Sequence, residues 1–147
     1  MENKKEVRKL ADNVNHPSHY AGQGKIECID FMEEMVKGYS GIEAVCLGNA
    51  IKYLWRYPYK GRPEEDLEKA KWYISHAAEK PGTKVEKGKN LYIIDHGIAE
   101  MLEGKEPAEK RILADILEHI FNRTYAKNII LVNYKIEKLK TLTIENA

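Results

Sequence analysis

Cationic and polar residues recur at helical spacing in the first half of the chain. Asn49, Lys52 and Arg56 stand at positions i, i+3 and i+7, so they share one face of a predicted helix. The turn that follows adds more rings and cations, namely Tyr57, Tyr59, Lys60 and Arg62. Arginine offers phosphate a bidentate fork, lysine a mobile charge, and tyrosine a ring on which a base can stack. The pattern indicates a nucleotide-phosphate site or, alternatively, a solvated helix face whose cations pair with nearby carboxylates.

Two further groups of residues could complete such a site. A polar stripe on the next predicted helix, which could face the first one, consists of Asp66, Lys69, Tyr73 and His76. A short segment ahead of both helices contains His16, Pro17, Ser18, His19 and Tyr20. Its imidazoles could ligate a metal when neutral, or contact phosphate or deliver a proton when protonated. The structural alternatives are an ordinary intrahelical pair of Asp66 with Lys69, and local backbone hydrogen bonds from Ser18 and His19.

Carboxylates recur on the first predicted helix at spacings that place them in a row. Glu27, Asp30 and either Glu33 or Glu34 stand at i, i+3 and i+6 or i+7. Such a row suits Mg²⁺, which prefers oxygen ligands, but carboxylates in a first turn also stabilise the helix dipole without any metal. The chain contains neither a GxxxxGK[ST] loop nor a GxGxxG loop, so phosphoryl transfer here would need another architecture.

Charge and cysteine content limit the classes of protein. The 147 residues include 24 Lys and Arg against 23 Asp and Glu, a formal net charge of +1. No global field would draw the molecule to DNA, RNA or an anionic membrane, so any anion site must be local. The two cysteines, Cys28 and Cys46, form no CxxC pair, and we find neither a secretory leader nor an apolar stretch of roughly 18 residues. These features predict a cytoplasmic protein that does not enter the membrane.

Hydrophobic periodicity predicts an all-α fold. The expected parts are a flexible arm (residues 1–13), a small domain of about three helices (14–80), a charged connector (81–89) and a helical extension (90–147). Within the small domain, helices are expected over residues 26–37, 42–57 and 63–80. The stretch 129–142 begins with β-branched residues, but a lone strand would have no partner, so a helix is preferred. The apolar faces of the extension predict a homo-oligomer.

Four sequence blocks form a combination that is more specific than any block alone. They are VNHPSHY (14–20), ECID (27–30), GNAIKYLWR (48–56) and EDLEKAKWY (65–73). Together they resemble the phage-borne SaV-like family, long catalogued as a domain of unknown function, over about residues 13–78. The resemblance implies a phage or prophage protein that acts in the bacterial cytoplasm. One coliphage member of that family phosphorylates deoxynucleoside monophosphates without a Walker loop, and a lactococcal member is sensed by a host abortive-infection system.

The leading interpretation is a protein that binds nucleotide phosphates and, in its enzymatic version, a nucleotide kinase that uses Mg²⁺. Similarity to the kinase member would make the site candidates His16, His19, Tyr20, Asn49, Lys52, Arg56, Asp66 and Lys69. Lys52 and Arg56, with Lys60 and Arg62, would neutralise the transferring phosphate. Asp66, or Glu27 with Asp30, would hold the metal, and Tyr57 or Tyr59 would stack on the base.

Two rival interpretations come from other classes of protein. The first is a non-catalytic sponge that sequesters a nucleotide immune signal, of the cyclic or ADP-ribose type, and so counters host anti-phage defence. The second is a protein-binding factor that uses the apolar helices after Pro107 as its contact surface. The sponge would retain its ligand unchanged, whereas the protein-binding factor would have no nucleotide affinity.

Overall fold

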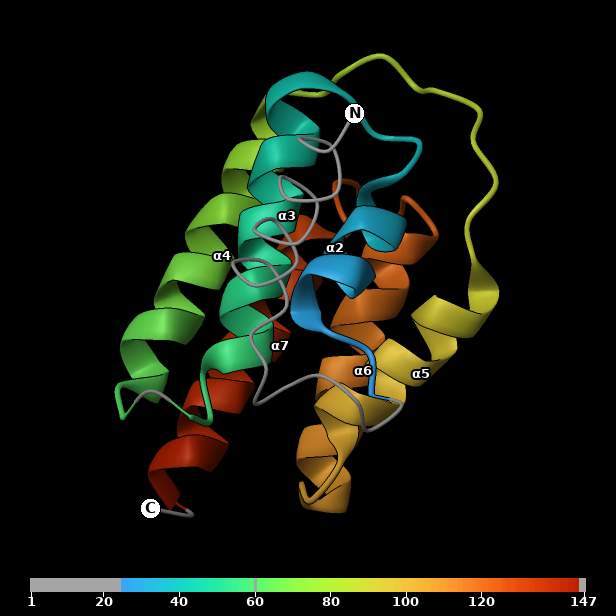
Figure 1. Ribbon diagram of the computed structural model, residues 1–147. Coiled ribbons are helices and arrows are strands. Elements are labelled where there is room, and N and C mark those ends of the chain that lie inside the picture. Colours follow the sequence, from blue (N-terminus) through green and yellow to red (C-terminus); the bar gives the residue numbers. More distant parts are fainter. Residues whose placement is uncertain (1–24, 60, 146–147) are drawn as a thin grey trace, which may run out of the picture.

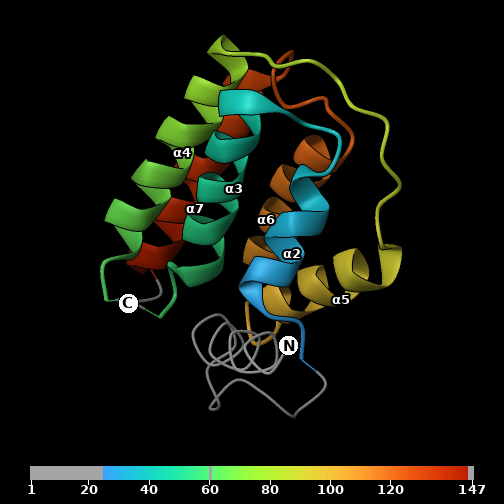
Figure 2. The ribbon, with the colours of Figure 1, turned by 45° about the horizontal axis from the view of Figure 1, so that its top comes forward.

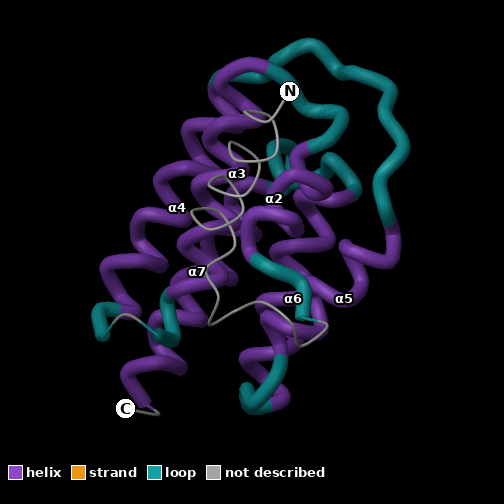
Figure 3. Tube along the Cα trace, viewed as in Figure 1, coloured by secondary structure: helices purple, strands orange, loops and turns teal. Residues whose placement is uncertain are grey.

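The computed structural model describes residues 25–59 and 61–145 of the chain. In these two ranges every regular element is an α-helix, as predicted (Figures 1 and 3). The helices are α2 (Cys28–Val36), α3 (Gly41–Arg56), α4 (Pro63–Glu79), α5 (Leu91–Leu102), α6 (Pro107–Phe121) and α7 (Ile129–Glu145). The ambiguous stretch from residue 129 onward is therefore helical, which confirms that preference.

Local sequence signals account for several of the helix ends. Pro63 and Pro107 open α4 and α6, where their fixed φ suits the first helical turn and their missing N–H is not needed. Asn90 caps α5 by accepting a hydrogen bond from the backbone N–H of Ile93 at 3.3 Å. Gly38, with φ of 91°, follows α2 in a left-handed conformation that other residues rarely adopt.

The helices form a closed ring around the core. Along this ring α3 packs on α4, α4 on α7, α7 on α6, α6 on α2 and α2 on α3, while α5 lies against α2 and α6. Figures 1 and 2 show α3 and α4 side by side with α7 behind them. Gly97 permits the close contact of α5 with α2, because a Cβ at this position would collide with the ring of Phe31.

One hydrophobic core includes side chains from both halves of the chain. Leu47 and Ile51 of α3 belong to the same buried cluster as Leu117 of α6 and Ile136 of α7, and all four are fully buried. The expected connector at residues 81–89 therefore does not separate two cores. Residues 90–145 complete the core that α2, α3 and α4 begin.

The connector is fastened to the turn between α2 and α3; we call residues 81–90 the strap. The Ser40 hydroxyl donates to the Thr83 carbonyl at 2.6 Å, and the Gly82 N–H donates to the Glu43 carboxylate at 3.0 Å. A Cβ at Gly82 would collide with the Ser40 carbonyl oxygen, so this close approach depends on glycine.

Lys89 provides the strongest attachment of the strap. Its ammonium donates to three backbone carbonyls at the end of α2, those of Glu34 at 3.1 Å, Met35 at 2.8 Å and Lys37 at 2.7 Å. Cations are favoured at this end of a helix, where carbonyl groups lack intrahelical partners. Burial, with a contribution from the nearby charge of Arg123, lowers the pKa of Lys89 to about 8.

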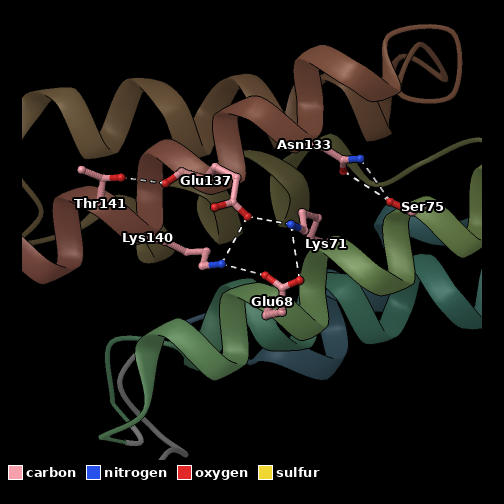
Figure 4. A network of polar contacts seen from close by, with 7 residues as sticks. All are labelled: Glu68, Lys71, Ser75, Asn133, Glu137, Lys140 and Thr141. Atoms are coloured by element: carbon pink, nitrogen blue, oxygen red, sulfur yellow. Dashed lines mark hydrogen bonds and ion pairs between the residues drawn. The ribbon is translucent and has the colours of Figure 1, made fainter.

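Four charged side chains form a closed network between α4 and α7: Glu68, Lys71, Glu137 and Lys140 (Figure 4). The Nζ atom of Lys71 lies 2.6 Å from a carboxylate oxygen of Glu137, and that of Lys140 lies 2.7 Å from Glu68. The hydrogen bond from Lys71 holds the pKa of Glu137 below its ordinary value. The hydrogen bond from Lys140 does the same for Glu68. The network therefore attaches α7 to α4 through charges of both signs.

We predict that Glu137→Gln lowers the free energy of unfolding by about 0.5–1 kcal/mol near pH 6, a modest amount because solvent screens this network. Because the pKa of Glu137 is lower in the folded than in the unfolded protein, its contribution to the free energy of unfolding is complete when the pH is above the unfolded pKa, near 4.5. As the pH falls further, the unfolded state binds a proton first, and the contribution is lost through the folded pKa. Urea denaturation of both proteins at several pH values measures the difference.

Glu33→Gln is the matched control, because Glu33 is exposed on α2 and forms no ion pair with the residues that the structure describes. It should leave stability nearly unchanged at every pH. A Glu137→Gln effect that stays constant from pH 6 to pH 3, or that is no larger than the Glu33→Gln effect, would contradict the stabilising role of the network.

Candidate functional site: the α3–α4 cationic face

Two tyrosine rings stack where α3 and α4 run side by side. Tyr53 of α3 and Tyr73 of α4 have ring centroids 5.9 Å apart and an interplanar angle of 12°. Both side chains are partly buried, so their rings are held by the helix pair while part of their surface meets solvent. Of the two predicted polar stripes, the structure brings together Arg56 with Asp66, and Lys69 and Tyr73 with the ring of Tyr53.

Three cations surround the ring of Tyr53. The distances to its centroid are 4.8 Å from Lys52 Nζ, 5.2 Å from the guanidinium carbon of Arg56 and 5.4 Å from Lys69 Nζ. Such distances allow cation–π attraction, which partly offsets the repulsion among the cations. We call the group of Lys52, Tyr53, Arg56, Lys69 and Tyr73 the cationic face.

Arg56 is oriented by a buried carboxylate. Its Nε donates to Oδ2 of Asp66 at 3.2 Å, and the Asp66 residue is only 2% exposed. The guanidinium itself is partly exposed, with 38% of the side-chain surface accessible. Asp66, predicted as a catalytic residue that could hold the metal, is buried and accepts a hydrogen bond from Arg56 in this structure. The rigid fork of Arg56 is thereby presented at the surface.

The remaining cations differ in how far carboxylates neutralise them. Glu65 contacts both Arg62 at 3.3 Å and Lys69 at 3.4 Å, so one carboxylate is shared between two cations. Lys52 forms no ion pair with the residues that the structure describes. Its charge is felt at Cys28 of α2, where burial raises the thiol pKa to about 12 and Lys52 acts against that rise. The cationic face therefore retains net positive charge.

More rings continue along α4 beyond the cationic face. Trp72 contacts Tyr73 edge to face, with centroids 5.1 Å apart, and stacks on His76 at 4.9 Å with an interplanar angle of 9°. Trp72 is 57% exposed, which is unusual for so large an apolar side chain. The prediction omitted Tyr53 and Trp72. Their signals were present, because Tyr53 adjoins Lys52 and Trp72 follows Lys69 by three residues.

Three of the predicted ligand-binding residues occupy other environments. The Asn49 amide donates back to the Val45 carbonyl of its own helix at 3.1 Å. Tyr57 is only 1% exposed and its hydroxyl donates to Glu109 of α6 at 2.6 Å, so its ring is not available to stack on a base. Burial, and then this bond, raise the pKa of Tyr57. Tyr59, by contrast, is 69% exposed and can offer its ring.

Other predicted site residues lie outside the part of the chain that the structure describes. They are His16, Ser18, His19, Tyr20 and Lys60. The predicted metal ligands Glu27 and Asp30 fall at the start of α2, as its N-cap and in its first turn. Among residues 25–59 and 61–145, no three His, Cys, Asp or Glu side chains are grouped so that they could hold a metal ion.

A hollow in the described surface is lined by none of the residues of the cationic face. It has a volume of about 450 Å³ and is bordered by Ile26, by α5 residues that include His96 and Glu100, and by Lys110 of α6. The cationic face is therefore defined by its rings and charges.

Among the described helices, none is long and apolar enough to cross a membrane.

Fold and site define an all-helical protein with a cationic, aromatic face between two antiparallel helices. Residues 14–75 match the model of a family described as a protein of unknown function (DUF3310). That segment includes α2, α3 and most of α4, and with them the whole cationic face. No curated protein and no solved structure matches the chain.

We predict that Asp66→Ala lowers the free energy of unfolding by about 1–3 kcal/mol, because it removes a buried hydrogen-bonded carboxylate and leaves Arg56 without that partner. Glu65→Gln is the control at an exposed carboxylate of the same helix turn, and it should have a smaller effect. Urea denaturation followed by circular dichroism gives both values. Equal effects of the two variants would show that the Asp66–Arg56 pair has no special structural role.

Proposed function

We propose that the protein binds nucleotide phosphates at the cationic face. The observation that carries the proposal is the convergence of Lys52, Arg56 and Lys69 on the ring of Tyr53, which itself stacks on Tyr73. Cations supply the charge that phosphate oxygens require, and aromatic rings supply a surface for a base. A nucleotide combines both groups in one small ligand.

Local charge supports an anionic ligand although the chain as a whole is nearly neutral. Asp66 compensates Arg56, and Glu65 is shared between Arg62 and Lys69, which leaves Lys52 and part of the Lys69 charge for a ligand. The bond to Asp66 uses Nε, and no hydrogen bond joins the Nη groups of Arg56 to residues 25–59 or 61–145, so the two Nη groups could form a bidentate contact with a phosphate. A bound phosphate would also relieve repulsion among the three cations.

Two versions of this function use the same site. In the kinase version, Lys52 and Arg56 stabilise the charge on a phosphate as it is transferred between nucleotides, and Mg²⁺ that arrives with the triphosphate supplies further charge neutralisation. In the sponge version, the same residues hold an intact nucleotide signal. The resemblance supports three further parts of the proposal: a phage origin, a location in the host cytoplasm and a role against host defence. The apolar helices support a fourth part, self-association.

The test is to incubate the purified protein with mono-, tri- and cyclic nucleotides in the presence of Mg²⁺ and to analyse bound and free fractions by chromatography. We expect retention of nucleotide at about one molecule per site. New diphosphates in large excess over protein would assign the kinase version, whereas recovery of unchanged ligand would assign the sponge version. No retention of any nucleotide would contradict the proposal and direct attention to a protein partner.

Lys52→Met should weaken nucleotide binding about tenfold, as expected for the loss of one charge-assisted contact of about 1.4 kcal/mol. This variant leaves the Asp66–Arg56 ion pair in place. It therefore tests the ligand site without leaving the buried Asp66 carboxylate unpaired. Lys138→Met, at an exposed position of α7, is the matched control and should bind like wild type. Isothermal titration calorimetry measures all three affinities, and equal affinities would show that the cationic face is not the binding site.

A further inference from the structure

Four side-chain rings, one from α3 and three from α4, are in contact one after another. The series begins inside the cationic face and ends outside it. Tyr53 stacks on Tyr73, Tyr73 contacts Trp72, and Trp72 stacks on His76, each with centroids 5.9 Å or less apart. The cations are gathered around Tyr53 at one end of this series. The large exposed indole of Trp72 lies further along the series, between Tyr73 and His76. A single nucleotide at Tyr53 would leave that indole unused.

We infer that the cationic face takes a ligand with two bases joined through phosphate, one base on the tyrosine pair and the other on Trp72; this inference rests on the proposed function. At least one phosphate of such a ligand lies between its two nucleosides, so it can reach Lys69, which precedes Trp72 by one helical turn and also approaches Tyr53. Linear and cyclic dinucleotides share this chemistry.

The arrangement favours stacking over base-specific recognition. Every base has a face that can stack on an aromatic ring, and side chains of this kind bind successive bases with little dependence on sequence. His76 supports one side of the indole at 4.9 Å, which limits the rotation of Trp72 and reduces the entropy lost when a base stacks on it. Trp72 is thus a specificity-determining residue for ligand length.

Fluorescence can test the inference, because the chain has only two tryptophans, Trp55 and Trp72. Trp55 is partly buried and contacts the ring of Phe31 at 5.8 Å, so Trp55→Phe keeps an aromatic side chain there and leaves Trp72 as the sole tryptophan, which is excited selectively over the tyrosines at long wavelength. This protein is titrated with the dinucleotide pApA and, separately, with ADP. We expect pApA to bind about tenfold or more tightly than ADP, in keeping with one additional stacked base, and to quench Trp72.

The variant Trp72→Leu should abolish the advantage of pApA over ADP while leaving ADP affinity within about twofold, as measured by calorimetry. Trp72→Phe retains a ring and should keep part of the advantage. Equal affinities for pApA and ADP in the wild-type protein, or an advantage that survives Trp72→Leu, would overturn the two-base inference while nucleotide binding itself stood. Failure of both ligands to bind would contradict the proposed function as well.

Discussion

The contact between α3 and α4 is the constraint on which the proposed site depends. The two helices pack against each other, and each has fully buried alanines, Ala50 on α3 and Ala70 and Ala77 on α4. Near the turn that joins them, Arg56 is bonded to Asp66, and further along, Tyr53 stacks on Tyr73. A rotation of either helix would separate both pairs at once. The positions of the cations therefore follow from the register of this helix pair.

The rest of the chain holds this pair in place from two sides. The charge network between α4 and α7 attaches α4, which carries part of the cationic face, to the C-terminal helix (Figure 4). At the other end of α3, the buried carboxylate of Glu43 accepts from Gly82 of the strap and from the Tyr125 hydroxyl. Helices outside the matched segment 14–75 thus contribute to the rigidity of the site without contributing residues to the cationic face. A preorganised surface loses less entropy when a ligand binds.

Sequence periodicity was sufficient to predict the helices and to predict which polar residues share a face of each helix. The spacing of Lys52 and Arg56 on one helix, and of Asp66, Lys69 and Tyr73 on the next, depends only on the helical repeat, so it could be predicted. The environment of each side chain depends on distant partners and could not. Tyr57 is buried in the core, and its hydroxyl donates to Glu109, which lies 52 residues further along the chain. The single core could not be predicted for the same reason. The sequence shows that α6 and α7 have apolar faces, but not which helices those faces contact.

The most direct test of the central claim is an amide chemical-shift titration of the isotopically labelled protein with ATP, followed by two-dimensional NMR. Binding at the cationic face predicts that the largest shift changes fall on residues of α3 and α4 around Tyr53, Tyr73 and Arg56, with little change in α5 or the outer side of α7. Shift changes concentrated at the hollow beside His96, or no saturable changes at all, would contradict the account.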